Sequence, residues 1–327
     1  MDPLSLDQLR VLLAVADHGS FSAAARAMRR AQSAVTYAVQ RMEEQVGVPL
    51  FDRAAYRPVL TEAGRALLPR ARRISEEVAA LHAQARGIAG GLEPELSIVV
   101  ETLFPMCRLV AALAAFSLRH PTVPTRLSVE NLGAATGLLV DGTCALGLLP
   151  LPFAHGEDLV TAPVLDVELL PLAAPGHALA AFDGLIPADA LREHVQLVLT
   201  DRSDRTRGRD FNVVSSRTWR IGDMGAKHAL LLAGLGWGSL PRHLVEDDLA
   251  HGRLVALRPA ESAANEGRVR LPFIVAHARA RPLGPAGTWL FGELAASIDA
   301  TVDARPYAPL GRPASVRAPA RSALKVV

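Results

Sequence analysis

Hydrophobic residues recur at helical spacing in three successive segments at the start of the chain. Leu6, Leu9 and Leu13 share one face of a first predicted helix. FSAAARAM (21–28) predicts a second helix, and AQSAVTYAVQRMEEQV (31–46) predicts a third. The buried stripe of the third helix consists of Val35, Val39, Met42 and Val46. The chain therefore opens with short amphipathic helices separated by tight turns.

The third predicted helix also presents a polar face, which contains no carboxylate. Hydroxyl and amide groups both donate and accept hydrogen bonds, so they can read base edges when such a helix enters a DNA major groove. A solvated face of a small helical bundle would show the same pattern, so this face alone favours neither interpretation. The candidate base-reading residues are Gln32, Ser33, Thr36, Tyr37 and Gln40.

Two short strands are predicted next, at about 49–52 and 58–60, around an arginine-containing turn. Basic groups in such a wing would lie against phosphates, and phosphate contacts position a protein without specifying sequence. Residues 1–90 carry twelve arginines against nine acidic residues, an excess that agrees with DNA binding without proving it. The candidate phosphate-binding residues are Ser22, Arg30, Arg53 and Arg57.

A heptad repeat follows the wing. Apolar residues recur every seven positions along a predicted long helix, which indicates two helices packed side by side. A single helix packed against its own domain would show a similar stripe, and that alternative stays open. Gly90-Gly91 then marks a hinge. The candidate dimerisation residues are Leu67, Ile74, Val78, Leu81 and Ile88.

Residues 4–68 contain FSAAARAM, QSAVTYAVQRMEEQVGVPLFDR and LTEAG in order. They resemble the winged helix-turn-helix of LysR-type transcriptional regulators. The resemblance implies a DNA-binding domain at 1–61 and a dimerisation helix with a hinge at 62–91. It also implies a homodimer or homotetramer that binds an interrupted palindrome in double-stranded DNA, and contact with RNA polymerase if the protein is an activator.

From residue 95 apolar strands alternate with helices, which predicts an α/β domain with parallel strands. The strings LLLAGLGWGSLPRHLVEDDLAHGRLV and APGHALA extend the resemblance to the two-lobed effector domain of the same family, which is similar to periplasmic binding proteins. The resemblance implies an effector domain at 92–300, with lobe I at about 92–162 and 268–300 and lobe II at about 163–267. A disordered basic tail is expected at 301–327.

Such domains bind ligands beyond the carboxyl ends of their strands. The residues there mix hydroxyl, amide and apolar groups, so we expect a small-molecule effector, an organic acid or an aromatic compound. Arg202 belongs to a charged loop that is either simply solvated or a rim that attracts an anion. The candidate effector-binding residues are Thr102, Leu103, Phe104, Asn131, Leu132, Thr200, Arg202, Ser203, Asp223 and Met224.

The sequence disfavours several chemistries. A GxGxG at 234–238 lacks the strand and helix that a dinucleotide cofactor needs. Without an HExxH pair, a histidine–cysteine cluster or a GxSxG elbow, we expect no metal, no cofactor, no catalytic residue and no enzyme activity. Cys107 and Cys144 are expected to be small buried residues rather than a redox pair. The competing interpretation is a metabolite-binding or enzymatic α/β protein with an accessory helical domain.

Composition agrees with a globular chain of two or three domains, since half of the 327 residues are hydrophobic. No signal-peptide pattern opens the sequence, and no apolar run is long enough to span a membrane. A cytoplasmic protein with no membrane partner is therefore expected. Lysine is rare: only Lys227 and Lys325 occur beside 33 arginines.

Overall fold

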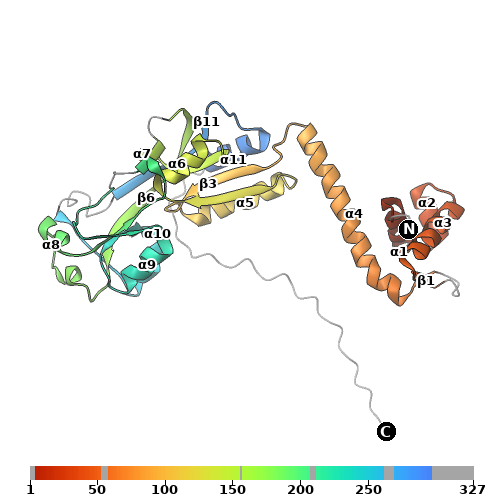
Figure 1. The fold of residues 1–327 in the computed structure, drawn as a ribbon, viewed down its shortest axis with the longest axis horizontal. Coiled ribbons are helices and arrows are strands. Elements are labelled where there is room, and N and C mark those ends of the chain that lie inside the picture. The colour runs from red at the N-terminus through yellow and green to blue at the C-terminus, as the bar shows by residue number, and fades with distance from the viewer. Residues whose placement is uncertain (1–3, 53–57, 155–156, 207–210, 261–268, 297–327) are drawn as a thin grey trace, which may run out of the picture. The chain divides into compact units, whose positions relative to one another are not determined.

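The computed structural model describes residues 4–52, 58–154, 157–206, 211–260 and 269–296. They form two compact units, which divide the chain after Pro94, and each unit is described by itself (Figure 1). Arg53, Arg57 and the tail 301–327 lie outside the described residues, so the predictions about them stay predictions.

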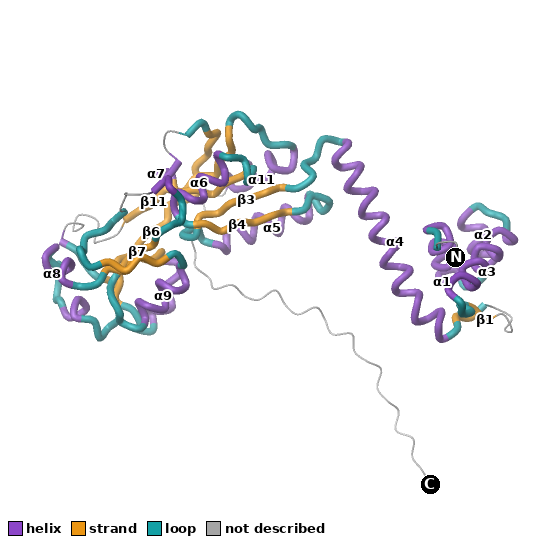
Figure 2. The backbone as a smooth tube through the Cα atoms, in the orientation of Figure 1, coloured by secondary structure: helices purple, strands orange, loops and turns teal. Residues whose placement is uncertain are grey.

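The first unit contains three short helices, a two-stranded wing and one long helix (Figures 1 and 2). Each element predicted from the hydrophobic pattern is present, with its ends shifted by a few residues at most. The elements are α1 (Leu6–His18), α2 (Phe21–Met28), α3 (Gln32–Val46), β1 (Phe51–Asp52), β2 (Val59–Leu60) and α4 (Glu62–Ala89).

Side-chain caps fix where these helices begin. Ser5 Oγ accepts the Gln8 N–H at 3.2 Å, and Gln8 Oε1 accepts the Ser5 N–H at 2.8 Å, which forms a capping box at α1. Thr61 Oγ1 accepts the Gly64 N–H at 2.9 Å and so caps α4. A Cβ on Gly64 would lie 2.1 Å from the Leu50 carbonyl oxygen, so only glycine lets α4 start this close to the wing.

The core of the first unit uses the predicted stripe of α3. Val35 and Val39 are fully buried and pack with Val11 and Leu12 of α1. Glu43, one turn further along α3, accepts the backbone N–H groups that lead into β1, at 2.7 and 3.1 Å. Because one face of α3 is used in this way, its opposite face is left to solvent.

The second unit is an α/β domain built from two lobes joined by two long strands, β6 (Leu159–Ala173) and β11 (Val269–Ala278). Lobe I contains β3 (Leu96–Glu101), α5 (Met106–Arg119), β4 (Thr125–Glu130), α6 (Leu132–Val140), β5 (Leu146–Pro150), α7 (Leu151–Ala154) and α11 (Pro285–Ala296). Lobe II contains η1 (Ala178–Ala181), α8 (Ala188–Glu193), β7 (Gln196–Leu199), η2 (Asp204–Thr206), β8 (Thr218–Ile221), α9 (Met224–Leu232), β9 (Gly238–Pro241), α10 (Arg242–Ala250) and β10 (Val255–Ala256).

The main sheet is mixed rather than parallel throughout, with the strand order β10-β6-β11-β5-β3-β4 and β9 also paired with β6. The predicted parallel pairing is confirmed for β3 with β4 and β5, and for β7 with β8. It is wrong for the strand predicted at DVELLPLAAP (166–175), which belongs to β6 and runs antiparallel to β9, β10 and β11. β11 in turn runs antiparallel to both β5 and β6. The reason is topological: the chain leaves lobe I along β6 and returns along β11, so these strands must run in opposite directions.

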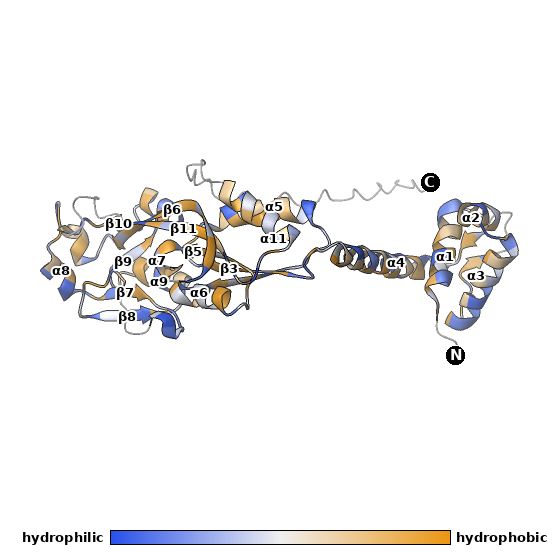
Figure 3. Ribbon diagram, turned by 90° about the horizontal axis from the view of Figure 1, so that it is seen from above, coloured by the Kyte–Doolittle hydropathy of each residue, from blue (hydrophilic) through white to orange (hydrophobic). Residues whose placement is uncertain are grey.

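Both lobes share β6. Its residues from Leu159 to Leu169 pair with β11, and those from Leu169 to Ala173 pair with β9 and β10. The lobe boundary predicted at residue 162 therefore falls inside a continuous strand. Figure 3 shows β5 and β11 mainly in the colour of hydrophobic residues, and every residue of β5 is buried, as expected for strands covered on both faces.

Candidate DNA-binding helix and effector cavity

The polar face of α3 is open to solvent. Gln32, Ser33 and Gln40 are exposed, Tyr37 is 64% exposed and Thr36 is half-buried. None of the five side chains forms a hydrogen bond with another described residue. The face therefore holds hydrogen-bonding groups that the fold itself does not use.

Two candidate phosphate-binding residues, Ser22 of α2 and Arg30 just before α3, have protein partners. Ser22 Oγ accepts a hydrogen bond from Arg26 at 2.9 Å. Arg30 forms an ion pair with Asp7 at 2.8 Å, and that carboxylate raises the pKa of the guanidinium. Both groups of the pair are about half exposed, so the pair is weak and a phosphate could compete with Asp7.

The heptad stripe of α4 divides into a buried part and an open part. Ala71 is buried, and Leu67 packs against the core of the first unit. Further along, Ile74, Leu81 and Ile88 are 46%, 63% and 44% exposed, and Val78 is half-buried. Packing of α4 on its own domain accounts for the first part of the stripe only. The remainder is an unpartnered apolar face, and Figure 3 shows hydrophobic and hydrophilic residues alternating along the helix.

In the second unit, a buried carboxylate joins the end of β3 to the start of α6. Glu101 is fully buried, and its two oxygens accept the N–H groups of Leu103 at 2.8 Å and Leu132 at 3.1 Å. Burial raises the pKa of Glu101 to about 7. Leu132 has a φ of +47°, a strained left-handed conformation for leucine, and the carboxylate holds this first residue of α6 in place.

Two polar side chains join the lobes beside the start of α6; we call Asn131 and Asp201 the clasp. Asn131 Nδ2 donates to the carbonyls of Thr200 at 3.1 Å and Gly222 at 2.7 Å, at the ends of β7 and β8. Asp201 of lobe II accepts the Ala134 N–H of α6 at 2.8 Å. A carboxylate at a helix N-terminus is stabilised by the helix dipole, so the clasp favours contact between the lobes.

The short helix η2 of lobe II packs directly against α6. A Cβ on Gly133 would lie 2.9 Å from the Thr206 side chain and 3.1 Å from Cβ of Arg205, so this approach requires glycine. Arg205 also forms an ion pair with Glu157 of lobe I. These contacts lie next to the clasp and extend the contact between the lobes.

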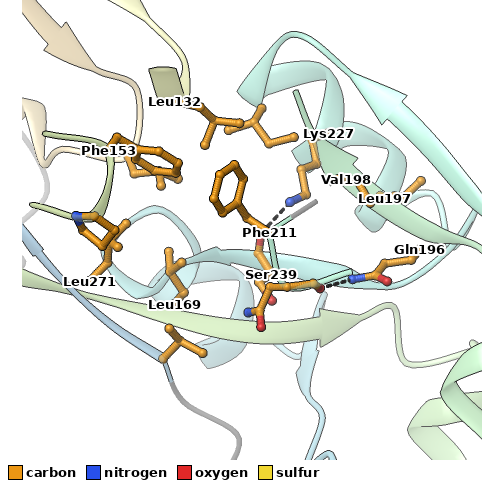
Figure 4. Close-up of a pocket in the computed structure, with 15 residues that line it drawn as sticks. Leu132, Phe153, Leu169, Gln196, Leu197, Val198, Phe211, Lys227, Ser239 and Leu271 are labelled. Carbon is orange, nitrogen blue, oxygen red and sulfur yellow. Dashed lines mark hydrogen bonds between the residues drawn. The ribbon is translucent and has the colours of Figure 1, made fainter. Parts of the chain in front are cut away.

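A cavity of about 380 Å³ lies between the lobes (Figure 4). Phe153 of lobe I and Phe211 of lobe II meet edge to face at its wall, with ring centroids 4.7 Å apart. The wall is otherwise mainly aliphatic. Its lining residues are Leu103, Leu132, Pro152, Phe153, Leu169, Gln196, Leu197, Val198, Leu199, Phe211, Asn212, Lys227, Ser239, Val269 and Leu271.

Few polar side chains reach this cavity. Gln196 is bound to the 212–215 segment: its Oε1 accepts the N–H groups of Val214 and Ser215, and its Nε2 donates to the Asn212 carbonyl. Lys227 is 5% exposed, and its Nζ donates to the Ser239 carbonyl at 2.7 Å. Burial lowers the pKa of Lys227 to about 8.

Within the part of the chain that the structure describes, no three His, Cys, Asp or Glu side chains gather as a possible metal site. No helix there combines the length and the apolar character needed to cross a membrane.

Comparison with known proteins decides the family. Residues 6–65 match the bacterial regulatory helix-turn-helix protein, lysR family, and residues 89–298 match the LysR substrate binding domain. The chain belongs to the LysR family. It is therefore a DNA-binding transcriptional regulator with an effector-binding domain, and the LysR family is one of regulators rather than enzymes.

The relatives cover most of the chain. The HTH-type transcriptional regulator YhaJ of Escherichia coli O157:H7 is 30% identical over 309 residues, which is 89% of this chain and 96% of that protein. The uncharacterized HTH-type transcriptional regulator YeiE of Escherichia coli (strain K12) is 31% identical and covers 77% of this chain and 85% of its own. A solved structure of an OxyR cysteine mutant from Corynebacterium glutamicum has a TM-score of 0.51 at 20% identity, covers 90% of this chain and 93% of its own, and shows the same fold.

The structure places the predicted effector residues of this LysR regulator in three settings. Leu103 and Leu132 line the cavity. Phe104 and Met224 are buried, and Thr102 is half-buried. The polar candidates already have protein partners or lie in solvent: Asn131 and Thr200 at the clasp, Ser203 hydrogen-bonded to Asp201, Asp223 as the N-cap of α9, and Arg202 exposed.

Sequence reasoning missed Glu101, Lys227, Phe153 and Phe211. Lys227 left a signal, because it stands at helical spacing between the buried residues Met224 and Leu231, where a lysine is unusual. The expectation that both cysteines are buried is right for Cys144 and wrong for Cys107, which is exposed on the first turn of α5. That turn faces solvent because the core side of α5 is formed by Leu109, Ala112 and Phe116.

Proposed function

We propose that this LysR regulator binds an interrupted palindrome as a dimer or tetramer and that a small molecule held between its lobes controls this binding. The observation that carries the proposal is the polar face of α3, which is exposed while the opposite face is buried. A helix held in this way can enter a major groove with its hydrogen-bonding groups unpaired.

In this proposal the five polar residues of α3 read bases, and the basic residues around them hold phosphates. Gln32, Ser33, Thr36, Tyr37 and Gln40 are the base readers; Ser22, Arg30, Arg53 and Arg57 contact the backbone. The open part of the α4 stripe, Ile74 to Ile88, would pack against the same face of a second copy. Two copies of α3 would then face two half-sites, which explains the expected palindrome.

The effector domain would supply the control. A ligand shifts a conformational equilibrium only when it binds one arrangement better than another. The clasp and η2 give the lobes a defined contact that a ligand in the neighbouring cavity could strengthen or weaken. The hinge at Gly90-Gly91 would pass this change to the DNA-binding heads, and an activator would in addition contact RNA polymerase. A cytoplasmic location follows from this role.

The test is selection of the full-length protein on random duplex DNA, followed by sequencing, at near-physiological salt. We expect an interrupted palindrome whose half-site spacing reports the geometry of the dimer. Binding that is salt-sensitive but independent of sequence would contradict the proposal, because it would reduce the first unit to a basic accessory domain.

A further inference from the structure

The cavity between the lobes holds a cation that no acidic side chain among the described residues neutralises. Lys227 projects from α9 into the wall and is 5% exposed. Its hydrogen bond goes to the Ser239 carbonyl, which is neutral, and no described carboxylate forms an ion pair with it. Burial of an ammonium without a counter-ion is unfavourable, so buried charges are normally paired. At neutral pH this amine still carries a proton, because its pKa of about 8 lies above 7.

The residues around Lys227 limit the kind of ligand that could supply its counter-charge. Gln196, the largest polar neighbour in the wall, has its oxygen and nitrogen committed to the 212–215 segment. Asn212 and Ser239 also line the wall, and the remainder is Leu, Val, Pro and Phe, with Phe153 and Phe211 closing one side (Figure 4). The cavity thus offers one positive charge in a mainly apolar wall, and none of its lining residues is a carboxylate.

The volume sets the size of the occupant. A cavity of about 150 Å³ accepts a benzene ring. The cavity here, of about 380 Å³, has room for roughly 15 non-hydrogen atoms by the same ratio. A sugar or nucleotide would leave many polar groups unpaired against this wall, whereas a hydrocarbon body with a single charged end would not.

We propose that the effector is an amphipathic monocarboxylate whose carboxylate pairs with Lys227 and whose apolar body packs against the paired rings of Phe153 and Phe211. This inference rests on the proposed function, in which a molecule between the lobes controls DNA binding. It assigns the anionic contact to the buried lysine rather than to the exposed Arg202 of the rim loop. An aromatic body suits the edge-to-face pair of phenylalanines, and an aliphatic chain suits the leucines of β6 and β11.

The experiment measures binding by titration calorimetry on the full-length protein without DNA. The probes are 4-phenylbutyrate, octanoate and the neutral 4-phenylbutanamide. Wild type should bind 4-phenylbutyrate at least about tenfold more tightly than the amide, since a charge-assisted hydrogen bond is lost in the amide. Lys227→Met, which keeps most of the length of the side chain, should weaken binding of the two acids by roughly 10- to 100-fold and leave the affinity for the amide within about twofold.

Arg270 of β11 provides the matched control. It lies between Val269 and Leu271, which line the cavity, but its own side chain is exposed, as alternation along a strand requires. Arg270→Met removes the same charge from the opposite face, so it should leave the affinity for each probe unchanged. An equal effect of both substitutions would show general attraction of anions instead of a specific contact.

Three results would overturn the inference: no binding of either acid to wild type at millimolar concentration, equal affinity for acid and amide, or unaltered affinity in Lys227→Met. The comparison of acid with amide on wild type decides even if that variant does not fold. The inference and the proposed function can fail separately. If the protein selects a palindrome but binds neither acid, the carboxylate effector is ruled out and the DNA-binding function stands. If it binds the acids but its affinity for DNA does not change, the carboxylate site stands and control of DNA binding by this ligand is ruled out.

Discussion

The polar face of α3 and the clasp contain similar side chains with opposite hydrogen-bonding states. On α3, hydroxyls and amides project from a well-packed helix without a partner among the described residues. In the clasp, Asn131 and Asp201 are bound across the lobes at distances of 2.7 to 3.1 Å. Buried polar groups nearly always have a hydrogen-bond partner in the protein, whereas exposed groups bond to water and stay available to another molecule. Polarity alone therefore does not separate the two regions; the hydrogen-bonding state of their groups does.

The difference extends to the apolar surfaces. The second half of the α4 stripe is exposed, as a surface that packs against a second copy would be, while the mainly apolar wall between the lobes lines a cavity. Changes in the first unit should therefore alter association with DNA or with a second chain. Changes at the contact between the lobes should alter the stability of the second unit.

The largest effect is expected from Leu81→Asp on α4. A charge in the open stripe should prevent dimer formation, and loss of two-headed binding should weaken affinity for the selected palindrome by more than about 100-fold. Sedimentation and fluorescence anisotropy measure the two effects. Ala79→Asp is the control, because at 100° per residue Ala79 lies almost opposite Leu81 and is also exposed. A dimer that survives Leu81→Asp would contradict the role of the stripe.

Next comes the pH dependence that Glu101 gives to the second unit. Its folded pKa of about 7 lies above the ordinary value of 4.5, so between these pH values the folded state retains a proton that the unfolded chain has released. The stabilising contribution is therefore greatest below about pH 4.5 and is lost as the pH rises to about 7. The free energy of unfolding of wild type minus that of Glu101→Gln should fall by at most about 3 kcal/mol across this window.

Urea unfolding followed by tryptophan fluorescence measures this contribution, since all three tryptophans, Trp219, Trp237 and Trp289, lie in the second unit. Asp189→Asn is a suitable control, because the Asp189 side chain is 92% exposed and is solvated in both states. If the difference in free energy of unfolding between wild type and Glu101→Gln did not change with pH, the Glu101 carboxyl would not titrate in this range.

A smaller effect should separate base reading from phosphate contact. Gln32→Ala should lower affinity for the selected palindrome by about 1–3 kcal/mol and relax the preference at one base pair. Arg30→Ala should weaken binding to all sequences alike and reduce the salt dependence. Repeating the selection with each variant gives both profiles. Identical base preferences in the two variants would remove the division of roles on and beside α3.

The smallest effect is expected at the clasp. Asn131→Ala removes two hydrogen bonds between the lobes, which should lower stability by about 1–2 kcal/mol and the melting temperature of the second unit by a few degrees. The Asn131 side chain makes no capping bond to α6, so the loss reports the contact between the lobes. Arg205→Ala, which removes an exposed ion pair, should change the melting temperature less. Equal changes would mean that the clasp is no stronger than that pair.

The first unit could be predicted closely because its signals are local. Caps such as Ser5 and Thr61, and the spacing of Val35, Val39 and Met42, act within a turn or two of the chain. The exposed residues of α3 then follow from the buried ones by geometry. Gly64 and Glu43 could not be assigned in this way, since their roles depend on where the wing meets α4 and α3.

The second unit could be predicted in outline only. Its strands and helices carry clear apolar patterns, but the direction of β6 depends on pairing with β11, whose residues lie at least 100 positions further along the chain. The same holds for the cavity, which combines Leu103 and Lys227 with Phe153 and Phe211 from separate segments. The rule that ligands bind beyond the carboxyl ends of parallel strands placed Leu103 and Leu132 correctly at the cavity. It could not predict that the neighbouring polar groups would form hydrogen bonds with protein groups.

The rarity and burial of Lys227 have a consequence for proteolysis. A protease that cuts only after lysine has two sites in this chain, Lys227 and Lys325. The first is inside the effector domain and 5% exposed, so internal cleavage requires opening of that domain. Fragments 1–227 and 228–325 should therefore accumulate at a rate set by opening, and a molecule that fills the cavity should slow them. The rate at which these fragments appear on a gel therefore reports how often the effector domain opens around Lys227.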